Sequence, residues 1–300
     1  MSGTASFSSN YLLSDQLAEY MRRRVLHETH PCTTAVLPQP LEFEVQTFIA
    51  LNQMAATLAQ AYRNPLPSGI ELIRLSESLS PRETGFNLNQ EAHILSAHPP
   101  YLGGYLDVPA IILGEGDAIA LWYLPSAMSQ SMQDQMVGAI PPLSNMLTQS
   151  ISDGSWRTSP DYFGVDHHLL AGCLELSLAR HQLGHAMHII LTRAHQPSVS
   201  ADLAAPAARQ WIQAVQTPLA ILLASLSIMH PSLYNASHQA MRQLSKWSAT
   251  NDPEMAAVLQ HWPTIYTNIS MIANQSAPLH RDLQSCANWY DMLVSVGNYS

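Results

Sequence analysis

The sequence predicts an α+β protein, in which a largely helical region leads into β structure near the end of the chain. Two patterns predict this class. Segments of helix length, separated by prolines, fill most of residues 126–247, and β-rich runs appear at 105–125 and again after residue 263. Because the chain has 300 residues, of which 47% are hydrophobic, it is long enough to bury one or two cores. We therefore expect a folded globular protein.

The first part of the chain divides into two regions. Residues 1–40 are expected to be a poorly structured N-terminal segment, with one short amphipathic stretch from Leu12 to Val25 and prolines near its end. Residues 41–262 are expected to form a mixed, mainly helical region. Its first helix is predicted from Phe43 to Tyr62, because apolar residues recur there at helical spacing and stop before Asn64-Pro65.

A β-hairpin is predicted near residues 105–125. Two β-rich runs, Tyr105 to Leu113 and Ala118 to Pro125, flank the turn sequence Gly114-Glu115-Gly116-Asp117. Pro109 cannot donate a ladder hydrogen bond, so the first run is either an edge strand or begins after this residue.

Four helices are predicted after the hairpin, and prolines together with a serine cap at Ser126 mark their ends. They span residues 126–139, 167–194, 206–229 and 231–247. β character returns at Thr264 to Ala273 and at Asn288 to Val296, so residues 263–300 are predicted to hold the first strands of a β core.

Composition restricts the partners and the location. The formal net charge of -9 argues against a surface that binds nucleic-acid phosphates broadly, and the short basic cluster Arg22-Arg23-Arg24 is interpreted as a solvated helix end. The most apolar stretch, Leu219 to Met229, is about half of a ~20-residue membrane span, so we expect no membrane partner.

The N-terminus contains no visible secretory signal. Widely separated cysteines indicate reduced thiols in an intracellular protein, with the nucleus as one option: Cys32, Cys173 and Cys286.

A His-x-Asp pair near the end of the chain is the first candidate metal site. His280 and Asp282 stand in the segment NQSAPLHRD, and non-haem iron oxygenases use this spacing for two of their three protein ligands. Alternate residues of a strand point the same way, so an imidazole nitrogen and a carboxylate oxygen can occupy adjacent positions around one metal ion. His280 and Asp282 are therefore candidate metal ligands.

A second candidate metal site is a set of helical histidines. His181, His185 and His188 lie at i, i+4 and i+7, on one face of the predicted helix, and His195 continues that face. Imidazoles at this spacing can bind zinc or copper. The alternative is a polar helix face, since no HExxH motif and no carboxylate ligand accompany the histidines.

Other catalytic motifs are absent from the sequence. The string His-Arg-Asp also occurs in protein kinases, but here no glycine-rich loop precedes it and no Asp-Phe-Gly follows. There is no GxSxG, P-loop or GxGxxG motif. Hydrolase and nucleotide-binding functions therefore have no motif to support them.

The stretch from Asn274 to Asp282, followed by Trp289-Tyr290-Asp291, resembles the iron-binding segment of the TET/JBP-type 2-oxoglutarate- and Fe(II)-dependent dioxygenases, in particular a fungal branch. Those proteins commonly have Asn-x-x-x-Pro-x-His-Arg-Asp followed by a Trp-Tyr-Asp-like strand. The resemblance implies an incomplete double-stranded β-helix (jelly-roll) core at residues 263–300. It also implies Fe(II) and 2-oxoglutarate as cofactors, His280 and Asp282 as iron ligands, and a nucleic-acid partner, with 5-methylcytosine-type base oxidation in intact relatives.

The sequence departs from the family downstream of this pair. The family's third ligand is a later histidine, and an arginine then binds the distal carboxylate of 2-oxoglutarate, but the 19 residues after Arg281 contain no His, Arg or Lys. Two ligands hold iron weakly, and a dicarboxylate buried without a cation costs several kcal/mol. His261 is an alternative third ligand that the family order does not support. We therefore expect an N-terminal part, a C-terminally truncated product or a degenerate copy of such a dioxygenase, inactive on its own.

The alternative function is a non-catalytic protein-interaction module with a mainly helical core. The methionine-rich run from Met128 to Met146 is either an adaptable surface for a protein partner or ordinary core packing. Metal binding distinguishes these hypotheses, because the interaction module requires no metal.

Overall fold

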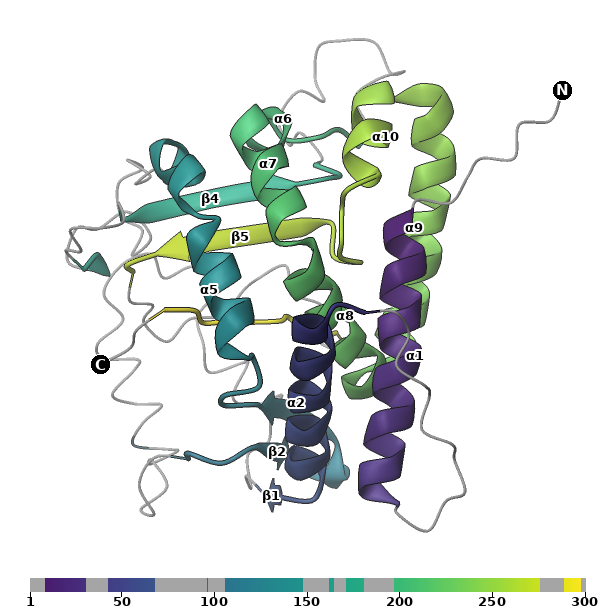
Figure 1. The fold of residues 1–300 in the computed structure, drawn as a ribbon, viewed down its shortest axis with the longest axis vertical. Coiled ribbons are helices and arrows are strands. Elements are labelled where there is room, and N and C mark those ends of the chain that lie inside the picture. Colours follow the sequence, from purple (N-terminus) through teal and green to yellow (C-terminus); the bar gives the residue numbers. More distant parts are fainter. Residues whose placement is uncertain are drawn as a thin grey trace, which may run out of the picture.

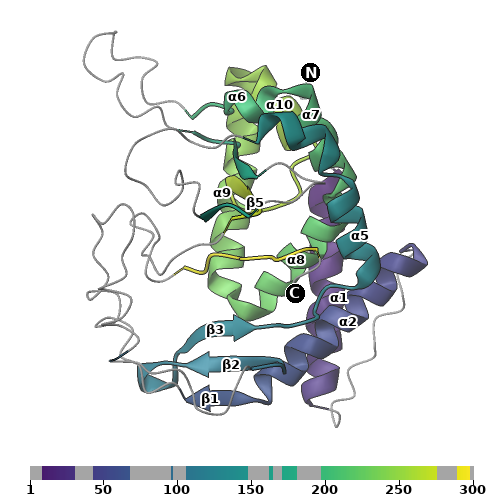
Figure 2. The ribbon, with the colours of Figure 1, turned by 90° about the vertical axis from the view of Figure 1, so that its left-hand side faces the viewer.

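The computed structural model describes residues 9–30, 43–67, 96, 106–147, 162–164, 171–180, 197–275 and 289–297. These residues form a mixed α and β protein in which a group of helices packs beside two small sheets (Figures 1 and 2). The α+β class is therefore confirmed.

A bundle of four helices forms the centre of the protein. The helix α8 is enclosed by the other three, and its residues from Ala220 to Ser227 are all buried. Its sequence contains no charged side chain, which allows burial on every side. Ser225 and Ser227 are buried at low cost because their hydroxyls donate to the carbonyls of Leu222 and Ala224, each at 2.6 Å. The four helices are α1 (Ser9–Thr29), α2 (Val45–Tyr62), α8 (Gln216–Met229) and α9 (Pro231–Asn251).

The N-terminal helix is longer than the sequence indicated. Residues expected to lie in a poorly structured segment form the 21-residue helix α1, and its Leu17 and Met21 side chains are fully buried. Apolar residues on one face of α1 therefore complete the core around α8. The helix α2 ends at Tyr62 as predicted, directly before Asn64-Pro65.

The segment predicted as one helix over 206–229 is divided into two. The helix α7 (Pro206–Ala214) meets α8 at Val215, where the two axes are bent by 63°. Pro218 explains the break, because it has no N–H to donate to the Ala214 carbonyl and its ring would clash with that carbonyl. No single helix in the described ranges is long and apolar enough to cross a membrane, although the bent pair α7 and α8 together meet the criteria of length and composition.

The predicted hairpin is present in the first sheet. The strand β2 (Ala110–Leu113) begins directly after Pro109 and pairs antiparallel with β3 (Ile119–Tyr123). Gly116 and Asp117 have φ values of 68° and 59° in the connecting turn, where glycine avoids a steric penalty. The strand β1 (Pro65–Pro67) adds to β2 in parallel, giving the order β1-β2-β3.

The second sheet corrects a predicted helix. The helix prediction over 167–194 is wrong within the described residues, since Gly172–Ser177 forms the strand β4. Leu174 and Leu176 are buried and Glu175 is exposed, which is the two-residue alternation of a strand. The strand β4 pairs antiparallel with β5 (Asn268–Ala273), which confirms the β prediction near 264–273.

The methionine-rich run packs mainly into the core. The helix α5 (Gln130–Gly138) starts after Ser129, whose hydroxyl accepts from the Met132 amide, so the cap is Ser129 and not Ser126. Met128 and Met132 are buried, which favours core packing over an adaptable surface. Two short helices complete this part of the fold: α6 (Ala201–Ala204) and α10 (Pro253–Leu259).

The β core expected at 263–300 is only partly visible. The described strands form one three-stranded and one two-stranded sheet, and no jelly-roll appears among the described residues. Residues 289–297, predicted as β from Asn288 to Val296, are not part of either sheet.

The contribution of α1 to the core can be measured by substitution. Leu17→Ala is expected to lower the free energy of unfolding by about 2–5 kcal/mol, because it leaves a cavity beside α8. Leu26→Ala on the same helix is the matched control; its side chain is 44% exposed, and we expect a change of about 0.5 kcal/mol. Urea denaturation measures both values, and equal losses would contradict the buried position of Leu17.

Candidate functional site

The residues of both predicted metal sites lie outside the described part of the chain. His280 and Asp282 fall between Gln275 and Trp289, and the helical histidines fall between Arg180 and Pro197. The structure therefore neither brings these ligands together nor separates them. It does describe the residues on each side of His280 and Asp282, and these show how the two ends of the candidate segment are held.

Asn274 and Gln275 hold the upstream end of the segment. Asn274 directly follows β5. It has a φ of 52°, a left-handed conformation that asparagine adopts more readily than most residues. Its carbonyl accepts from the Gly164 amide at 2.7 Å, and Gln275 forms an antiparallel bridge with Phe163. The Cys173 thiol of β4 also donates to Gln275 Oε1 at 3.2 Å. The segment therefore starts from a fixed position beside β4.

Tyr290 holds the downstream end through three contacts. Its hydroxyl donates to the Ile119 carbonyl of β3, and its own carbonyl accepts from the Tyr266 hydroxyl at 2.9 Å. Its ring packs edge-on against the His230 ring, with a centroid distance of 5.1 Å. Burial raises the pKa of Tyr290, so the hydroxyl remains a donor at neutral pH.

Tyr266 connects this contact to the protein core. Burial, followed by the negative charge of Asp291, raises the pKa of Tyr266 to about 12, so it also stays protonated. The backbone carbonyl of Tyr266 accepts from the indole N–H of the fully buried Trp262 at 2.8 Å. The chain after the His-x-Asp pair is thus held by groups that are themselves fixed.

A third metal ligand is not found in the described residues. His261 is exposed at the end of α10, and Gln216 donates to its backbone carbonyl at 3.1 Å. In the described ranges no group of three or more His, Cys, Asp or Glu side chains is arranged to hold a metal ion. The donor types of His280 and Asp282 suit Fe(II), but two donors do not make a complete site. No catalytic step through iron is derived from this set.

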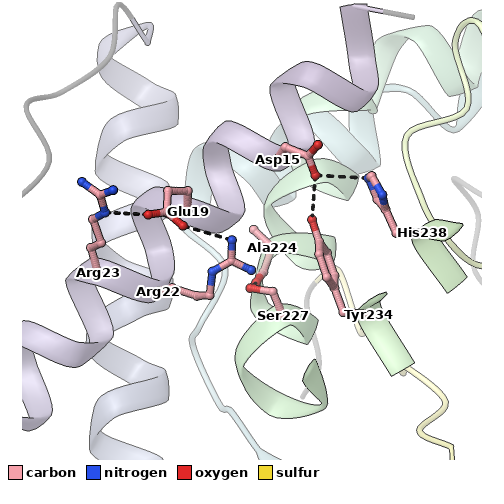
Figure 3. A network of polar contacts seen from close by, with 8 residues as sticks. All are labelled: Asp15, Glu19, Arg22, Arg23, Ala224, Ser227, Tyr234 and His238. Atoms are coloured by element: carbon pink, nitrogen blue, oxygen red, sulfur yellow. Dashed lines mark hydrogen bonds and ion pairs between the residues drawn. The ribbon is translucent and has the colours of Figure 1, made fainter. Parts of the chain in front are cut away.

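A polar network between α1 and α9 was missed by the sequence reasoning (Figure 3). Asp15 Oδ1 accepts from the Tyr234 hydroxyl at 3.3 Å and lies 3.1 Å from His238 Nε2. Asp15 Oδ2 lies 3.5 Å from Arg242 Nη2. The three partners are four residues apart on α9, so they share one helix face. This spacing was visible in the sequence, but nothing local indicated Asp15 as their partner.

The network shifts the pKa of its acidic groups. Burial raises the pKa of Asp15, but the contacts with His238, Tyr234 and Arg242 outweigh burial and leave it below the ordinary value. Burial, followed by the charge of Asp15, raises the pKa of Tyr234 to about 12. The Tyr234 ring stacks on His238 with a centroid distance of 5.7 Å. The contacts of the network join α1 to α9.

Each arginine of the basic cluster of α1 pairs with a glutamate of the same helix. Glu19 accepts from Arg22 at 3.1 Å and from Arg23 at 2.6 Å, and Arg24 pairs with Glu28 at 2.5 Å (Figure 3 shows the first two pairs). These pairs are at or near the surface. The cluster is solvated as expected, but it lies within α1 (Ser9–Thr29) and not at a helix end.

Comparisons with known proteins give no assignment. No protein-family profile matches this chain, and no curated protein matches it.

The Asp15 network predicts a specific pH dependence. The lowered pKa of Asp15 means that its contribution to stability is present above about pH 4 and is lost as the pH falls through the folded-state pKa. Wild type should therefore be more stable than Asp15→Asn at neutral pH, by at most about 1 kcal/mol because Asp15 is partly exposed. Denaturation between pH 3 and 7 measures this difference, which should shrink below about pH 4. A difference independent of pH would contradict the role given to the carboxylate.

Proposed function

We propose that this chain carries the first part of the iron-binding core of a TET/JBP-like 2-oxoglutarate- and Fe(II)-dependent dioxygenase, and that the chain alone does not turn over substrate. The observation that carries the proposal is the motif itself. His280 and Asp282 follow Asn274 and Pro278 at the spacing of that family, and Trp289-Tyr290-Asp291 follows in turn. His-x-Asp alone is a common spacing, so the flanking residues supply the specificity.

The order of elements around the motif supports this proposal. The strand β5 ends at Ala273, the motif residues follow at 280–282, and the described chain resumes at Trp289. In this proposal, the His-x-Asp pair presents an imidazole and a carboxylate to one metal ion from the chain that follows β5. Anchors at Asn274 and Tyr290 limit how far the ends of this stretch can move.

His280 would contribute a neutral imidazole nitrogen and Asp282 a carboxylate oxygen to Fe(II). When bound, Fe(II) and 2-oxoglutarate would supply the oxidising chemistry for a methyl group such as that of 5-methylcytosine, presented as a flipped base in a nucleic acid. The sequence after Arg281 contains neither a third imidazole nor a cation for the distal carboxylate of 2-oxoglutarate. This is why we propose no turnover by these 300 residues alone.

A non-catalytic protein-interaction module is the second candidate, and one observation favours it. Two large apolar side chains just after the motif are exposed: Trp289 at 60% and Leu293 at 94%. Exposed apolar groups of this size are common where another protein binds, although single ones are also found on ordinary surfaces. Met128 and Met132 do not contribute to such a surface, because both are buried.

An anaerobic Fe(II) titration, with and without 2-oxoglutarate, tests the proposed site. We expect weak Fe(II) binding that His280→Ala or Asp282→Ala weakens by at least about tenfold, because each removes one of two ligands. The triple variant His181→Ala, His185→Ala, His188→Ala is the matched control and should bind as wild type does. We also expect no visible charge-transfer band with 2-oxoglutarate and no succinate.

Two results would contradict the proposal in different ways. A charge-transfer band that vanishes in His280→Ala would mean that this chain completes the site, and the proposed lack of turnover would be wrong. Fe(II) binding that is absent, or equal in wild type and His280→Ala, would exclude the metal pair and favour the interaction module.

A further inference from the structure

We draw no further inference here: the strongest candidate, the partly exposed apolar face of the β1-β2-β3 sheet on which Leu66, Ile112 and Leu121 lie in register, carries no proposal because nothing in the described residues shows what covers it.

Discussion

The enclosure of α8 is the constraint on which the rest of the structure depends. A helix without a single charged side chain, buried from Ala220 to Ser227, must be covered on all sides, and α1, α2 and α9 provide that cover. Hydrophobic burial of this kind is the dominant favourable contribution to folding. The sheets depend on the same cluster, because β3 and β5 place their inward residues against it.

Polar contacts then decide how the covering elements are oriented. Hydrophobic contact is non-directional, so it brings α1 to the bundle without fixing its rotation or register. The carboxylate of Asp15, shared by Tyr234, His238 and Arg242, adds that direction at one face. Tyr290 has the same role for residues 289–297, since its hydroxyl donates to Ile119 and its carbonyl accepts from Tyr266. In both places a tyrosine with a raised pKa remains a hydrogen-bond donor at physiological pH.

Local sequence patterns predicted the elements whose causes are local. The end of α2 before Asn64-Pro65 and the hairpin turn at Gly116-Asp117 depend on neighbouring residues alone, and both were predicted. The strand β4 was missed because a short apolar run is compatible with helix or strand. Its partner decides the outcome, and Glu175 pairs with Ser270, which is 95 residues away. Asp15 and Tyr234 are 219 residues apart, so no local pattern could have joined them.

The same distinction applies to the candidate site: the sequence alone indicates the chemistry of the ligands, whereas their geometry depends on the folded structure. Ligand chemistry is a local property, so the motif alone could identify His280 and Asp282 as candidate metal ligands. Ligand geometry is not local, since a metal site requires side chains held within a fraction of an ångström by their surroundings. The described anchors at Asn274 and Tyr290 supply part of that support to the stretch between them, without supplying a third donor. In the described residues, contacts at Asn274 and Tyr290 thus fix the two ends of the stretch that holds the motif, and the geometry of the stretch itself depends on contacts between residues far apart in the sequence.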